Sequence, residues 1–137
     1  MGKLDCSIRS NHEATNQPCQ WPQPGGAYSS GLRVGDFVFV SGQTAIDPAT
    51  GQLVGDTIEE QTARVLENVK AILEAGGATM ADAVKVIAHL SDLALFDRYN
   101  RVYATYFPDP KPTRTTVGSQ LKGFMVEIDV IAYTGEK

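Results

Sequence analysis

The sequence predicts an α+β fold, in which a mixed β-sheet carries two helices packed on one of its faces. Two observations predict it. Short runs rich in β-branched and aromatic residues occur near both ends of the chain. Two longer segments between them have apolar residues at helical spacing. The expected order is β-β-β-α-β-α-β-β, and strands joined through helices favour right-handed crossovers with some parallel pairing.

The chain has 137 residues, which fits one domain with a single core. Its net charge is -4 and its basic residues are scattered, so we expect no nucleic-acid partner. No run approaches the roughly 20 apolar residues that cross a bilayer, so we expect no membrane partner. The N-terminus lacks the apolar region of a secretory signal, and a cytoplasmic location is therefore expected.

Residues 1–24 are expected to form an irregular N-terminal arm, because proline, asparagine and glutamine replace apolar periodicity there. Residues 25–137 are expected to form the single domain. Cys6 and Cys19 lie in the arm and are interpreted as free thiols, with a disulfide or a redox pair as the alternative.

The first predicted strands are residues 32–34 and 37–40, which flank a tight turn at Gly35-Asp36. The second of them ends at residues 41–43. Residues 47–51 have the composition of another turn, and they lead to a short predicted strand at residues 52–54.

The first helix should begin after Thr57, since Thr57 and Glu60 have the spacing of a capping box, and should end at Gly76-Gly77. A buried strand is expected at residues 83–90. The second helix is expected near residues 94–107. One stripe of this helix is aromatic and is interpreted as core rather than as a ligand site: Phe96, Tyr99, Tyr103 and Phe107.

Two strands are expected to close the fold, at residues 112–117 and 124–133. The last strand alternates between an apolar face, which should pack on the helices, and a mixed face that includes Glu127 and Asp129. A mixed face of this kind suits burial against another subunit, so we expect an oligomer.

Arg114 and Glu127 are the candidate catalytic residues. An arginine in an extended, β-branched run is costly to bury without a partner. It either forms a salt bridge with Glu127 or Asp129, or it binds a charged ligand through its guanidinium fork. Glu127 could serve as a general acid or base. The nucleophile-elbow and phosphate-loop patterns are missing, so no cofactor is expected, and the spacing of His12 and His89 predicts no metal site.

Five short segments, in this order, carry a resemblance to a known family: residues 26–29 (GAYS), 39–43 (FVSGQ), 97–100 (DRYN) with the aromatic residues that follow it, 112–114 (PTR) and 126–128 (VEI). Together they resemble the Rid family of reactive intermediate deaminases, also called YjgF-like proteins. The resemblance extends from about residue 25 to residue 133.

This resemblance implies a chorismate-mutase-like subunit that assembles as a homotrimer with its sites between subunits. It implies that Arg114 grips the α-carboxylate of the substrate and that Glu127 positions or activates the hydrolytic water. Many members have a cysteine where this chain has Thr116, and the connector at residues 118–123 looks short. The remaining implied pocket positions are Tyr28, Ser41, Gly42 and Asn100.

The implied activity is hydrolysis of reactive 2-imino or enamine acids to 2-keto acids and ammonia. The resemblance leaves three alternatives open. The chain could bind a small carboxylate without turnover, it could deaminate a specialised catabolic enamine, or it could cleave RNA. The acidic composition argues against the last of these.

Overall fold

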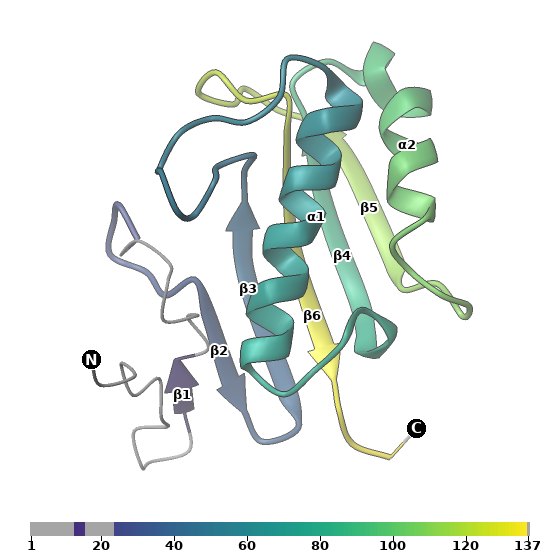
Figure 1. The fold of residues 1–137 in the computed structure, drawn as a ribbon. Coiled ribbons are helices and arrows are strands. Elements are labelled where there is room, and N and C mark those ends of the chain that lie inside the picture. Colours follow the sequence, from purple (N-terminus) through teal and green to yellow (C-terminus); the bar gives the residue numbers. More distant parts are fainter. Residues whose placement is uncertain (1–12, 16–23, 137) are drawn as a thin grey trace.

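The computed structural model describes residues 13–15 and 24–136 (Figure 1). Within these residues, six strands form one mixed sheet in the order β1-β2-β3-β6-β4-β5, and two α-helices cover one face of it. Among the strand pairs of the described residues, only that of β4 with β5 is parallel. The bounds are β1 Glu13–Thr15, β2 Gly31–Val34, β3 Phe37–Gln43, α1 Ile58–Ala75, β4 Ala83–Leu90, α2 Phe96–Ala104, β5 Thr113–Gly118 and β6 Val126–Tyr133. The predicted α+β class is confirmed.

Local sequence signals account for the ends of these elements. Gly35 has a φ of 57°, which glycine adopts without strain, and it begins the turn between β2 and β3. At the start of α1, Thr57 Oγ1 accepts a hydrogen bond from the Glu60 amide at 3.2 Å. The Glu60 carboxylate reaches back to the Asp56 amide, one residue before the cap. Gly76 caps the other end of α1, as expected.

Three expectations need correction. Residues 52–54 contribute only an isolated bridge between Ile46 and Leu53, because this segment pairs within its own turn and not with the sheet. Glu13–Thr15 is a strand that pairs with β2, although residues 1–24 were expected to be irregular. The second helix is shorter than predicted, since a separate 3-10 turn occupies Leu93–Leu95. Cys6 and Cys19 lie outside the described residues.

The alternation predicted for the last strand is confirmed. Val126, Ile128, Val130 and Ala132 are buried in the core beneath α1, whereas the residues between them are only half-buried. The opposite face of the sheet carries no helix (Figure 1). Phe37 and Phe39 remain 43% and 39% exposed on it. No helix in the described part of the chain is long and apolar enough to span a membrane.

Candidate active site

Arg114 lies on the edge strand β5, and its guanidinium contacts helix α2. Its Nη1 donates a hydrogen bond of 2.7 Å to Asn100 Oδ1. Its Cζ lies 4.5 Å from the centre of the Tyr103 ring and about a further ångström from the Phe96 and Tyr99 rings, at 5.5 and 5.6 Å. Among the ion pairs of the described residues, none includes Arg114. The alternative of a salt bridge with Glu127 or Asp129 is therefore wrong for the single chain.

Thr116 lies two residues along the same strand, on the same face as Arg114. Its Oγ1 is 3.3 Å from the hydroxyl of Tyr99, which is fully buried. Thr116 therefore contacts the aromatic stripe of α2. We call Asn100, Arg114 and Thr116 the arginine half-site.

Glu127 lies on β6 against Gly42 of β3. A methyl group added at Gly42 would lie 3.0 Å from the carboxyl carbon of Glu127 and 3.2 Å from its Oε1. The pairing of β3 with β6 shifts register between Val40 and Gln43, and this irregularity includes Gly42. The missing side chain at Gly42 thus leaves the space that the Glu127 carboxyl group occupies.

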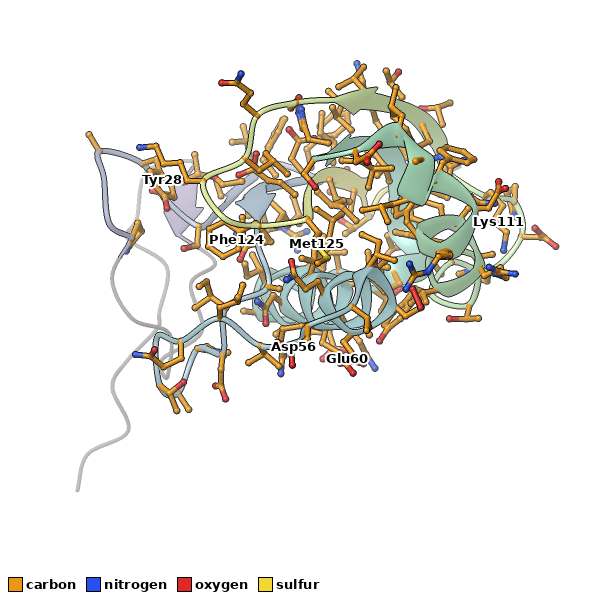
Figure 2. All side chains as sticks on the ribbon, turned by 90° about the horizontal axis from the view of Figure 1, so that it is seen from above. Tyr28, Asp56, Glu60, Lys111, Phe124 and Met125 are labelled. Atoms are coloured by element: carbon orange, nitrogen blue, oxygen red, sulfur yellow. The ribbon has the colours of Figure 1, made fainter. Side chains whose placement is uncertain are left out.

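Ser41 and Tyr28 belong to the same end of β3. The Ser41 hydroxyl donates a hydrogen bond of 2.6 Å to the Ser29 carbonyl, and the Ser41 amide donates to the Ser30 carbonyl. Ser41 therefore anchors the segment that carries Tyr28, whose side chain is 56% exposed. Figure 2 places Tyr28 at the opposite side of the molecule from Lys111, whose Nζ donates a hydrogen bond to the Ala104 carbonyl at the C-terminal end of α2. We call Tyr28, Ser41, Gly42 and Glu127 the carboxylate half-site.

The two half-sites lie on opposite faces of the sheet. Arg114 pairs in register with Val86 of β4, which is fully buried and faces the helices. Glu127 pairs with His89, three residues further along β4, so it faces the side without helices. The strands of Arg114 and Glu127 are also not neighbours, because β4 lies between them. One subunit cannot present both side chains to the same small molecule.

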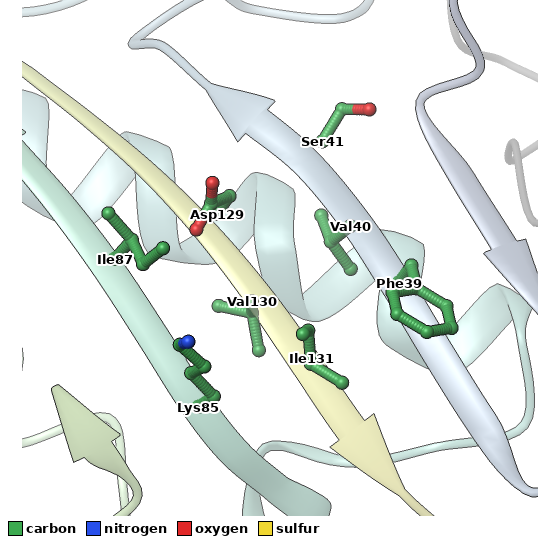
Figure 3. Close-up of a pocket in the computed structure, with 8 residues that line it drawn as sticks. All are labelled: Phe39, Val40, Ser41, Lys85, Ile87, Asp129, Val130 and Ile131. Carbon is green, nitrogen blue, oxygen red and sulfur yellow. The ribbon is translucent and has the colours of Figure 1, made fainter.

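The face without helices is hollowed beside the carboxylate half-site (Figure 3). The hollow has a volume of about 220 Å³ and is largely apolar, with Phe39, Ile87 and Ile131 among its lining residues. Asp129 also lines it, and burial raises the pKa of this carboxyl group, partly offset by a backbone hydrogen bond and by nearby His89 and Lys85. Apolar walls around a carboxyl group suit a face that another molecule covers.

Two features of the site were missed from the sequence. The aromatic stripe of α2 was interpreted as core only, and it also contacts Arg114. The spacing of the stripe along the helix does not indicate which residue of a neighbouring strand packs against it. His89 was considered as a possible metal ligand, and its Nδ1 lies 2.7 Å from Ser119 Oγ in the connector at residues 118–123. Only the register of β4 and β5 brings these two residues together.

Comparisons with known proteins agree on one family. The family model described as Endoribonuclease L-PSP matches residues 19–134. The chain is 50% identical over 114 residues to a RutC family protein of Pyrococcus abyssi, covering 82% of this chain and 90% of that one. It is 40% identical to Reactive Intermediate Deaminase A, chloroplastic, of Arabidopsis thaliana, covering 78% of this chain and 58% of the relative. The crystal structure of RidA from an Antarctic Psychrobacter is similar with a TM-score of 0.81 and 38% identity, covering 87% and 98% of the two chains.

Proposed function

Because this chain belongs to the Rid family, which includes a named reactive intermediate deaminase, we propose that it hydrolyses reactive 2-imino and enamine acids. The products are a 2-keto acid and ammonia. The substrate class we favour is that of 2-iminopropanoate and 2-iminobutanoate, small acids with a planar C=N group beside a carboxylate. This reaction requires one protein group that binds the substrate carboxylate and one group that transfers protons.

The observation that carries the proposal is the state of Arg114. Its guanidinium is half-buried, and its polar contacts in the described residues are with neutral groups, the amide oxygen of Asn100 and the hydroxyl of Tyr99. A guanidinium has five N–H donors in a planar fork, and these contacts leave several of the donors available. A buried cation is costly without an anion, so a ligand carboxylate would satisfy both charge and geometry.

Glu127 is the residue we assign to proton relay. A water molecule adds to C2 of the imine, and the Glu127 carboxylate accepts a proton as the C–O bond forms. The C=N electron pair moves to nitrogen, which takes that proton from Glu127. Glu127 then accepts the hydroxyl proton as the C=O bond forms, and the C–N bond breaks with transfer of that proton to the leaving ammonia. Both protons of the water end on nitrogen, and Glu127 is regenerated.

The opposite placement of the two half-sites supports a site that is shared between subunits. We propose that the chain forms a homotrimer in which the arginine half-site of one subunit meets the carboxylate half-site of the next. A head-to-tail contact of this kind joins two different surfaces of the same chain and closes into a ring. The hollowed face with its exposed Phe37 and Phe39 would be covered in that assembly.

The test generates 2-iminopropanoate and 2-iminobutanoate in situ with an amino-acid oxidase and follows them by semicarbazide trapping. Wild-type protein should speed the loss of imine, and Arg114→Ala should abolish this effect with the fold intact. Arg114→Lys keeps the charge and loses the fork, so it should retain little activity. Full activity of Arg114→Ala would refute the anchoring role.

A second candidate is deamination of a specialised enamine, and the short connector favours it. Residues 118–123 are tied to the sheet through the Ser119 amide, which donates to the Leu90 carbonyl, and through the His89 contact. A connector held this way would change the shape of the pocket. Wild-type protein that ignores both simple imines but binds 2-oxobutanoate through Arg114 would favour this candidate or a binding function without turnover. RNA cleavage that is retained in the Arg114→Ala variant would favour the hypothesis that the chain is a ribonuclease.

A further inference from the structure

The Arg114 guanidinium rests on a row of aromatic rings from one helix. Phe96, Tyr99 and Tyr103 are neighbours along α2, with ring centres 5.7 Å apart in each successive pair. Tyr103 is the ring nearest to the guanidinium, at 4.5 Å, within the range of a cation–π contact. Phe107 continues the row, packed 4.7 Å from Tyr103, and among the described residues it is not one of the rings that lie against Arg114.

The hydroxyl of Tyr103 makes no hydrogen bond within the described residues, although it is buried. Burial raises the pKa of Tyr103 to about 12, with Tyr99 adding to the increase and Arg114 opposing it, so the ring stays neutral at physiological pH. A buried hydroxyl without a partner is a cost to the fold. The part of Tyr103 that contacts a functional group is therefore its ring.

The direction of Arg114 needs more support than Asn100 supplies. The hydrogen bond to Nη1 and the polar contact with the Tyr99 hydroxyl hold single atoms at the end of a long side chain that has several rotatable bonds. The Tyr103 ring packs against the guanidinium, 4.5 Å from its Cζ, and limits its movement. An arginine already held in one direction loses less freedom when a carboxylate binds.

We propose that Tyr103 is a positioning residue, whose ring holds the Arg114 guanidinium in the direction required to bind the substrate carboxylate. The inference rests on the proposed function for its kinetic readout, and on geometry alone for its spectroscopic readout. It assigns different roles to neighbouring members of the same stripe: Tyr103 supports the site, and Phe107 only fills the core.

The kinetic test compares Tyr103→Phe, Tyr103→Leu and Phe107→Leu with the wild type on 2-iminobutanoate. Tyr103→Phe keeps the ring and should leave KM within about twofold. Tyr103→Leu should raise KM about tenfold with kcat changed much less, because it weakens an interaction made in both the ground and transition states. Phe107→Leu removes a ring of the same stripe and should lower Tm while leaving KM within about twofold of the wild type.

The spectroscopic test does not depend on turnover. Protein labelled with ¹⁵N-arginine should show an Arg114 Nε–Hε signal shifted upfield by the aromatic rings, identified by its loss in Arg114→Lys. The shift should persist in Tyr103→Phe and in Phe107→Leu, and it should decrease in Tyr103→Leu, in which the more distant rings of Phe96 and Tyr99 remain. If Tyr103→Leu does not fold, Tyr103→Met, whose side chain fills more of the space, takes its place.

The outcomes separate the two claims. Wild-type protein without imine hydrolysis would refute the proposed activity, and the Arg114 signal would still test the positioning role. Unchanged KM and an unchanged Arg114 signal in Tyr103→Leu or Tyr103→Met would overturn the positioning role. Equal increases of KM in Tyr103→Leu and Phe107→Leu would also overturn it, because they would show general core damage.

Discussion

Replacing Gly42 by alanine tests whether the position of the Glu127 carboxyl group matters. The added methyl would lie 3.0 Å from Cδ, 3.1 Å from Cγ and 3.2 Å from Oε1 of Glu127. These distances are shorter than carbon atoms normally adopt, so the Glu127 side chain must move by a few tenths of an ångström. Gly42 does not have a positive φ, and the substitution therefore adds no backbone strain.

The magnitude follows from this displacement. A misplacement of about 1 Å at a catalytic group can cost about a hundredfold in rate, so a few tenths of an ångström should lower kcat about three- to tenfold. Stability should change little. Glu127 is half-buried and can move toward solvent, and alanine reduces the freedom of the unfolded chain by about 0.4–1 kcal/mol relative to glycine.

The assay is the imine-trapping measurement of kcat together with Tm from thermal unfolding. Gly118→Ala is the matched control. Gly118 lies on β5, away from Glu127, and its added methyl would meet the Leu93 side chain at 3.4 Å, an ordinary van der Waals contact. Gly118→Ala should leave kcat unchanged. Wild-type kcat in Gly42→Ala would refute the claim that Glu127 must be held in place, and a large loss of Tm would show that the contact with Gly42 is structural.

Three further predictions concern stability. Asn68 is fully buried and donates hydrogen bonds to the carbonyls of Thr44 and Ile46. Asn68→Ala should therefore lower the unfolding free energy by about 3 kcal/mol in urea denaturation. A loss below about 1 kcal/mol would contradict the role of Asn68 in holding the loop that contains Thr44 and Ile46. Thr57→Ala should lower the unfolding free energy by about 1 kcal/mol, while Thr57→Ser should lower it much less, because serine keeps the capping oxygen. Equal losses in the two variants would contradict the capping role of Thr57. Asp129→Asn should stabilise the protein at pH 7. Burial raises the pKa of Asp129 in the folded state above its ordinary value of 3.8, so its ionised form is disfavoured on folding, and the advantage of asparagine should shrink as the pH falls toward that value. A gain of equal size at pH 4 and pH 7 would contradict this origin.

Local patterns predicted much of the fold. The alternation along β6 identified its core face, because a half-buried strand places every second side chain inside. The Thr57 cap and the Gly35 turn depend on a few neighbouring residues, so they too could be predicted from the sequence. Glu13–Thr15 was missed because a short edge strand is held mainly by backbone pairing, which leaves little trace in the side chains.

The relation between Arg114 and Glu127 depends on sheet order, which the local sequence does not contain. Their strands are consecutive along the chain, and this suggested adjacent strands and a possible salt bridge. Parallel pairing of β5 with β4 instead places β5 at the edge and β4 in between. The face that each residue occupies follows from its register with β4, at Val86 for Arg114 and at His89 for Glu127.

The most direct measurement for the shared site is complementation between two inactive variants. Arg114→Ala and Glu127→Gln would be purified alone and also co-expressed with different tags, so that mixed assemblies can be isolated. If each site takes Arg114 from one subunit and Glu127 from the next, every isolated mixed trimer has one junction of three at which both residues are intact, so it should show about a third of the wild-type activity. Mixed assemblies that remain as inactive as either variant alone would contradict a site built from two subunits.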